Sequence, residues 1–378
     1  MIKHCLIHFG FPKTGTTSIQ RFLRHKLSDP GFYYPAFNTS GGLSDDCHNR
    51  ALNCAFRSDP EKFHAHAKAG LSKEIIRQQG HAFCEQLQHA VRNASAHTLL
   101  LSAEDLSWFP ADDIRALIDF VTGLGLPTKA LAFVRRSKRD QESRFQQSLR
   151  DPGFLEITKQ RRNEFLSRFL TTHYKHPISN FDNGLGRSNV LLFEFDPSRF
   201  EGGCAVRQFC KLVGIRQQTI PATFVNDSLS SEALKLLCAY RTHGPGYGEG
   251  WGAMEENRRL VEKLSELKGP RLVFHSSLLN SKEDKWRADV EWAMERTGFD
   301  LLGNIYEDDD KPCVRGAEDM FRFSPESLDW LARAANVEPS RLASADPTVV
   351  AATVHTLRKQ LARPSLRGRL RNFVKGWF

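Results

Sequence analysis

A short apolar segment that runs into a loop of glycine, proline and small polar residues constrains the fold of this chain more than any other feature. The segment 3–9 (KHCLIHF) predicts a buried strand, and the loop 10–15 (GFPKTG) predicts a tight turn. The apolar residues after the loop recur at helical spacing and predict a helix; they are Ile19, Phe22, Leu23 and Leu27. A strand, a tight loop and a helix in this order open a βαβ unit, so we expect an α/β fold.

The same alternation continues to about residue 240. Further strands are predicted at 98–103, 129–134 and 190–193, and helices at 114–121, 138–150, 205–213 and 231–240. Strands that alternate with helices imply a mainly parallel sheet covered on both faces, which is a three-layer sandwich. Ligands of such sheets bind at the carboxyl ends of the strands.

The loop 10–18 (GFPKTGTTS) has the composition of an anion-binding site. Amide groups at a helix start, together with the helix dipole, favour a phosphate there. Gly10 and Gly15 let the backbone approach the anion, and Lys13 supplies a mobile positive charge. The hydroxyl residues Thr16, Thr17 and Ser18 add donors.

This loop differs from the Walker A loop of nucleoside triphosphatases, in which lysine follows the second glycine. Here Lys13 precedes Gly15, and Thr16 occupies the place of that lysine. The segment 12–17 (PKTGTT) resembles instead the loop with which sulfotransferases hold the 5′-phosphosulfate of 3′-phosphoadenosine 5′-phosphosulfate. The resemblance implies a P-loop-like fold, with the donor bound by the residues Lys13, Thr14, Gly15, Thr16, Thr17 and Ser18.

A second segment strengthens the resemblance. The run 135–143 (RRSKRDQES) follows a predicted strand and looks like the 3′-phosphate motif of the same family, with Arg135 at the strand end and Ser143 eight residues later. An arginine offers a bidentate fork to a phosphate, and a serine adds a neutral donor. Arg136 and Arg139 lie close enough in the sequence to assist.

The resemblance covers roughly residues 1–240. Segments 143–147 and 224–230 look similar to bacterial sulfotransferase-like proteins, including those associated with glycans. The resemblance implies transfer of a sulfuryl group to a hydroxyl or amine, on a carbohydrate or glycolipid acceptor. We expect an α/β domain at 1–240, a helical extension at 241–346 and a basic amphipathic tail at 347–378.

Sulfuryl transfer requires charge stabilisation on the leaving phosphate, which suits Lys13, and a base for the acceptor proton. Two residues are candidates for the base. His48 lies in a polar loop and titrates near neutral pH, whereas Glu104 follows the strand 98–103 directly. We prefer His48 slightly as the base. Each residue also has an ordinary alternative role: His48 as a hydrogen-bonded loop histidine, and Glu104 as a carboxylate that caps a helix.

Two other functions remain open. In a nucleotide-dependent kinase, Glu104 or Asp105 would help to hold Mg²⁺. The absence of the Walker A lysine disfavours this function. In a non-catalytic module that binds nucleotide or glycan, the same fold would lack turnover. The combination of Lys13, Arg135 and Ser143 disfavours that alternative.

The composition bears on metal binding and cellular location. The eight cysteines form no CxxC pair, so we expect reduced thiols and no metal site. No apolar run is long enough for a membrane span or signal-peptide core, which suggests a cytoplasmic location.

The formal net charge of +9 is concentrated at the C-terminus. Seven of the 53 basic residues, and none of the 44 acidic ones, lie in 347–378, so the rest of the chain is nearly neutral and we expect no nucleic-acid partner. Apolar residues alternate with these cations. The tail is therefore expected either to pack on its own domain or to contact the inner face of a membrane.

Overall fold

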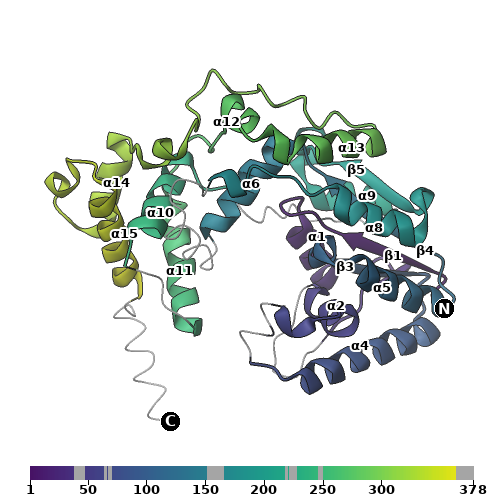
Figure 1. Cartoon of the computed structure of the whole chain (residues 1–378). Helices are drawn as coiled ribbons and strands as arrows, with labels where there is room; N and C mark the ends of the chain where they lie inside the picture. Colours follow the sequence, from purple (N-terminus) through teal and green to yellow (C-terminus); the bar gives the residue numbers. More distant parts are fainter. Residues whose placement is uncertain are drawn as a thin grey trace, which may run out of the picture. The chain divides into compact units, whose positions relative to one another are not determined.

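The computed structural model describes residues 1–37, 47–63, 66, 70–150, 166–217, 220, 228–245 and 250–362. The chain folds into two compact units that interleave along the sequence (Figure 1). The first comprises Met1–Asp140, Thr172–Val225 and Arg287–Leu302, and the second comprises Gln141–Thr171, Asn226–Trp286 and Gly303–Phe378. The expected domain boundaries at residues 240 and 346 stay predictions.

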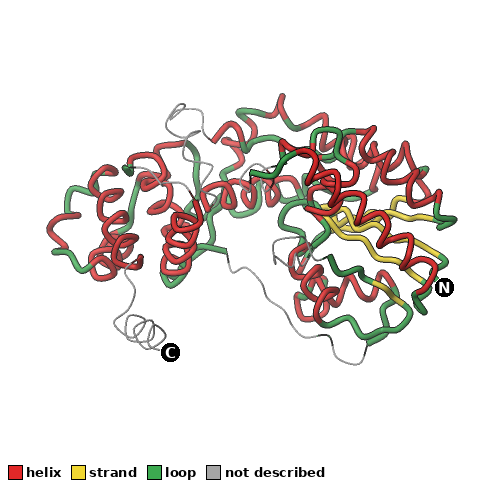
Figure 2. Tube along the Cα trace, turned by 90° about the horizontal axis from the view of Figure 1, so that it is seen from below, coloured by secondary structure: helices red, strands yellow, loops and turns green. Residues whose placement is uncertain are grey.

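A parallel sheet forms the centre of the first unit. Its strands are β1 (His4–Phe9), β2 (Phe32–Tyr33), β3 (Thr98–Ala103), β4 (Thr128–Val134) and β5 (Val190–Glu194). They lie in the order β2-β3-β1-β4-β5, every neighbouring pair is parallel, and Figure 2 shows them side by side in yellow. The predicted parallel sheet is confirmed.

Helices cover both faces of this sheet. The α-helices of the first unit are α1 (Thr16–His25), α2 (Asn49–Phe56), α4 (Lys73–Asn93), α5 (Ala111–Gly123), α8 (Lys175–Leu185), α9 (Ala205–Val213) and α13 (Arg287–Thr297). Helix α6 (Ser137–Arg150) begins in the first unit and continues into the second.

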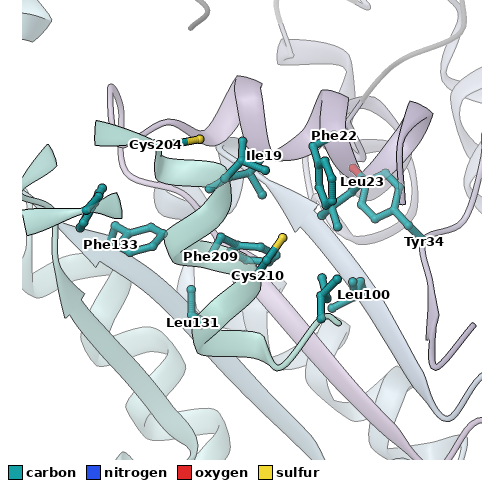
Figure 3. Packing of buried hydrophobic residues seen from close by; sticks show 13 residues of the cluster. Ile19, Phe22, Leu23, Tyr34, Leu100, Leu131, Phe133, Cys204, Phe209 and Cys210 are labelled. Carbon is teal, nitrogen blue, oxygen red and sulfur yellow. The ribbon is translucent and has the colours of Figure 1, made fainter. Parts of the chain in front are cut away.

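The apolar faces of α1 and α9 close one side of the sheet. Ile19 and Phe22 of α1 and Phe209 of α9 pack with Leu100 and Leu131 of the central strands (Figure 3). All five side chains are nearly inaccessible to water, and burial of an aliphatic or aromatic side chain contributes about 1.5–3 kcal/mol. This packing fixes the start of α1 above the carboxyl end of β1.

The opposite face is covered by α5 and α8. Side chains alternate across a strand, so His8 of β1 contacts Phe209 on the first side while Phe9 stacks on Phe181 of α8. The ring centroids of Phe9 and Phe181 are 4.2 Å apart. The first unit is therefore a three-layer α/β sandwich, as predicted.

The second unit is helical in its described part. Its α-helices are α10 (Ser231–His243), α11 (Gly250–Leu264), α12 (Ser276–Asn280), α14 (Pro325–Ala335) and α15 (Pro347–Ala362), together with the end of α6. The predicted additional C-terminal helices are thus confirmed.

Helix α15 forms the first half of the predicted basic tail. Its residues Val350, Val354 and Leu357 are buried, and the helix packs against α10, α11 and α14. This half of the tail belongs to the core of the second unit. Residues 363–378 lie outside the described part of the chain, so membrane contact stays a prediction. Across the described residues, no helix combines the length and apolar character that spanning a bilayer requires.

Candidate active site

Three loops meet at the carboxyl edge of the sheet. The loop 10–15, called the phosphate-type loop from here on, follows β1. Glu104 follows β3 directly, and Arg135 follows β4 directly. The order β3-β1-β4 makes these three strands neighbours, so their carboxyl ends lie next to one another. The crevice outside that edge is where open parallel sheets bind ligands.

The loop after β1 is held by its own hydrogen bonds. The carbonyl of Phe11 accepts bonds from Thr14 Oγ1 at 2.8 Å and from Thr16 Oγ1 at 3.4 Å. Lys13 has the left-handed conformation, with φ of 62°, which is uncommon for a residue other than glycine. The loop therefore maintains a strained backbone at its lysine, a feature often found at functional sites.

Two glycines allow the tight course of this loop. Gly15 has φ of 79°, and a Cβ built on it would lie 2.6 Å from the Cβ of Ala205. A Cβ on Gly10 would lie 2.2 Å from Thr16 Oγ1. Close packing therefore excludes larger side chains at both positions.

The loop leads into the N-terminus of α1. Gly15 is the N-cap residue and provides no side-chain cap, and the first turn contains no acidic residue. Amides of a first helical turn have no partner within the helix, so those of Thr16, Thr17 and Ser18 suit an anion. The Thr17 side chain is exposed, whereas those of Thr16 and Ser18 are buried. Thr14 and Thr16 direct their hydroxyls to the loop itself.

Arg135 connects the end of β4 to the phosphate-type loop. Its Nη1 donates to the carbonyl of Lys13 at 3.1 Å, and its guanidinium lies over the ring of Phe195. The hydroxyl of Tyr174 in turn donates to the carbonyl of Arg135 at 2.7 Å. Tyr174 was not predicted from the sequence, because its only distinguishing feature there is an isolated aromatic ring.

Glu104 is a half-buried residue at the same edge. Partial burial and, to a smaller extent, the charge of Asp105 raise the pKa of its carboxyl to about 7, while the charge of Lys13 acts in the opposite direction. The side chain of Glu104 does not cap the following short helix η2 (Asp105–Trp108), so the alternative capping role is not seen. A carboxyl with a pKa near neutrality beside a lysine is suited to proton transfer.

Asp105 is held differently from its neighbour. Its Oδ2 accepts a hydrogen bond from Asn53 Nδ2 at 3.2 Å, and its amide donates to Asn49 Oδ1 at 3.4 Å. These contacts tie Asp105 to helix α2. Within the described residues, no group of three or more His, Cys, Asp or Glu side chains could hold a metal ion.

His48 is integrated into the protein interior. Its Nδ1 accepts a hydrogen bond from the amide of Ser102 at 3.1 Å, so Nε2 carries the proton and donates to the carbonyl of Pro35 at 2.9 Å. The ring stacks on Tyr34 at 4.2 Å and meets the edge of Phe37. Burial lowers the pKa of His48 to about 4. The slight preference for His48 as the base rested on its ordinary pKa, and burial removes that basis.

A buried polar cluster lies beneath the phosphate-type loop. Ser102 Oγ is 2.8 Å from His8 Nδ1 and 3.3 Å from Gln20 Nε2. Burial lowers the pKa of His8 to about 3, so this ring is neutral at physiological pH. The cluster joins β1, β3 and α1, and its members carried no recognisable signal in the sequence.

The other members of the second motif follow Arg135 along the chain. Arg136 pairs with Glu194 at the end of β5, with 3.1 Å between Nε and Oε1. Arg139 and Ser143 lie on α6, and Ser143 falls in the part of that helix that belongs to the second unit. Their contribution to phosphate binding stays a prediction from the sequence motif.

No known family model matches this chain, and no curated protein matches it. Among solved structures, the crystal structure of a sulfotransferase from Alicyclobacillus acidocaldarius is similar to 64% of this chain and 95% of that chain. The sequence identity is 15% and the TM-score is 0.33. At this level of similarity, the comparison assigns neither a family nor an activity to the chain.

Proposed function

We propose that this protein transfers a sulfuryl group from 3′-phosphoadenosine 5′-phosphosulfate to the hydroxyl or amine of an acceptor. The observation that carries the proposal is the placement of two complementary groups at one edge of the sheet. Lys13 lies in the phosphate-type loop, and the half-buried Glu104, whose carboxyl has a pKa of about 7, lies within electrostatic reach of that lysine.

The shape and charge of the loop support this choice of donor. The first-turn amides of α1, the side chain of Lys13 and the exposed hydroxyl of Thr17 provide donors for the 5′-phosphosulfate. Arg135 lies at the same loop and suits the 3′-phosphate predicted for it. The close packing at Gly15 constrains the loop backbone, so the amide donors at the start of α1 are held in place before a ligand binds.

Lys13 and Glu104 would have different roles in the reaction. The acceptor oxygen or nitrogen forms a bond to sulfur, and the bond between sulfur and the bridging oxygen of the donor breaks. The bridging oxygen keeps the electron pair, and Lys13 with the first-turn amides stabilises the resulting charge. The proton of the acceptor passes to Glu104, which is about half ionised at pH 7.

The acceptor itself is assigned from the sequence resemblance. A carbohydrate or glycolipid carries several hydroxyls and is compatible with a base near neutrality. Contact of residues 363–378 with an anionic membrane would bring a lipid-linked acceptor to the enzyme. Both assignments are proposals.

Nucleotide binding tests the donor assignment. Isothermal titration calorimetry should show that adenosine 3′,5′-bisphosphate binds at least about tenfold more tightly than AMP, because a charge-assisted contact contributes about 1.5–3 kcal/mol. Equal affinity for the two nucleotides would contradict the assignment. A preference for ATP in the presence of Mg²⁺ would support the kinase alternative instead.

A further inference from the structure

Trp108 is a large aromatic side chain exposed at the candidate active site. It retains 47% of its accessible surface, whereas its neighbours Leu106 and Phe109 are buried. Tryptophan is usually well covered in folded proteins, so an indole exposed to this extent is noteworthy. It closes the short helix η2, which begins directly after Glu104.

The chain places Trp108 close to the candidate base. A 3₁₀ helix rises 2.0 Å per residue, so Trp108 lies roughly 8 Å along η2 from Glu104. The carbonyl of Glu104 accepts hydrogen bonds from both the amide and the hydroxyl of Ser107, at 3.1 and 2.8 Å. These bonds hold the turn between Glu104 and the indole in a defined conformation.

A second path of contacts connects Trp108 to the phosphate-type loop. The ring of His173 meets the indole edge to face, with centroids 5.4 Å apart. The next residue, Tyr174, bonds to the carbonyl of Arg135 and packs its ring against Phe11 at 5.8 Å. Trp108 is thus linked to the loop through His173 and Tyr174 and to Glu104 through η2.

The backbone beneath the indole is fixed from two sides. Arg57 Nη1 donates to the carbonyl of Trp108 at 3.3 Å. His176 and Asn180 of α8 both contact the carbonyl of Phe109, at 3.2 and 3.1 Å. An exposed ring on such a backbone is held in place before any ligand arrives, which lowers the entropic cost of binding.

We propose that Trp108, with His173 at its edge, is the platform on which a pyranose ring of the acceptor stacks. This inference rests on the proposed sulfuryl transfer and names the side chains that would hold its carbohydrate acceptor. The apolar C–H face of a sugar suits an indole face, and the exposed imidazoles of His173 and His176 supply polar partners for the hydroxyls. A stacked sugar would bring one hydroxyl toward Glu104.

Transfer of ³⁵S-labelled sulfuryl groups tests the platform. Cellotriose and tri-N-acetylchitotriose serve as sugar acceptors, and 2-naphthol serves as a flat acceptor without a sugar. We expect at least one trisaccharide to be labelled in preference to naphthol. Trp108→Ala should lower kcat/KM for that sugar about tenfold, mainly through a higher KM, and Trp108→Phe should retain most of the activity.

A matched control separates this effect from general loss of an exposed aromatic. Tyr306 is 71% exposed and belongs to the second unit, so Tyr306→Ala should leave the KM unchanged. Preferential labelling of naphthol, or an unchanged sugar KM in Trp108→Ala, would overturn the proposal.

A binding measurement distinguishes failure of the platform from failure of the proposed function. With all six tryptophans replaced by 5-fluorotryptophan, the ¹⁹F resonance missing from Trp108→Phe identifies Trp108. This resonance should shift on addition of a trisaccharide. A shift in a protein that does not bind adenosine 3′,5′-bisphosphate would retain the platform and reject sulfuryl transfer. Nucleotide binding without a shift for either trisaccharide would reject the platform alone.

Discussion

Arg135 donates a hydrogen bond from Nη1 to the backbone carbonyl of Lys13 at 3.1 Å. The arginine predicted to bind the 3′-phosphate therefore also supports the loop that is proposed to bind the 5′-phosphosulfate. The two roles have different consequences for ligands that lack a 3′-phosphate.

Arg135→Ala should weaken AMP binding as well as binding of adenosine 3′,5′-bisphosphate. Loss of the contact to Lys13 should cost AMP about threefold to tenfold in affinity, and loss of the phosphate contact should cost the bisphosphate more. Calorimetry with both nucleotides measures the difference. Unchanged AMP affinity would leave Arg135 with the phosphate role only, whereas an equal loss for both would leave the loop role only.

Lys13→Ala should reduce turnover more than nucleotide affinity. Charge grows on the bridging oxygen only as the sulfuryl group leaves, and removal of one such stabilising group typically lowers kcat about 100- to 1000-fold. Affinity for adenosine 3′,5′-bisphosphate should fall less than about tenfold. Single-turnover kinetics with calorimetry on the same samples checks both quantities, and parallel losses would assign Lys13 to ground-state binding.

Local patterns were sufficient to predict much of the sheet and its covering helices. The strand 98–103 and the helix 205–213 have the predicted bounds, because apolar periodicity is clear in both. Helix α4 (Lys73–Asn93) was not predicted, although Ile76, Phe83 and Leu87 follow helical spacing. Gly80 interrupts that pattern, and the structure shows why: a Cβ there would lie 2.5 Å from the carbonyl oxygen of Cys54.

Side-chain roles depend on distant partners and were harder to predict. The residues that bond to His48 are Pro35 and Ser102, which lie 13 and 54 positions away, so no local pattern could show that both ring nitrogens are engaged. The carboxyl of Glu104 was correctly expected at a strand end, but its raised pKa follows mainly from partial burial, which no local pattern shows. Trp108 had no periodic or motif signal at all.

Gly15→Ala should destabilise the protein and weaken nucleotide binding. The left-handed conformation costs a residue other than glycine about 1–2 kcal/mol, and the contact with Ala205 adds about 1–3 kcal/mol from overpacking. Urea denaturation measures the free energy of unfolding. Gly125→Ala is the matched control, because Gly125 has φ of 78° but no heavy atom within 4 Å of its added Cβ.

Gly125→Ala should lose only the part of the free energy of unfolding that comes from the left-handed backbone conformation. Its nucleotide affinity should be unchanged. A loss in Gly15→Ala no larger than that in Gly125→Ala would show that α9 yields to the added methyl group. The tight packing at the start of α1 would then not be a requirement of the loop.

Protonation of Glu104 should make the stability of the protein depend on pH. The pKa of its carboxyl is raised from about 4.5 in the unfolded chain to about 7, so the folded protein binds this proton more tightly. The contribution of the protonated Glu104 carboxyl to the free energy of unfolding is fully present below pH 4.5. It is lost as the pH rises through about 7. Glu104→Gln should therefore gain about 2–3 kcal/mol of stability over the wild type at pH 8, and little at pH 4.

Activity should follow the opposite trend, because the ionised carboxylate accepts the proton. Wild-type turnover should rise with pH through about 7, while Glu104→Gln should bind nucleotide normally and lose turnover by about 100-fold or more. His48→Ala is the comparison. It should lose about 2–4 kcal/mol of stability, because its removal leaves the Ser102 amide and the Pro35 carbonyl without their ring partner. The folded fraction of His48→Ala should remain active. If His48→Ala instead binds nucleotide without turnover, and Glu104→Gln stays active, the base is His48.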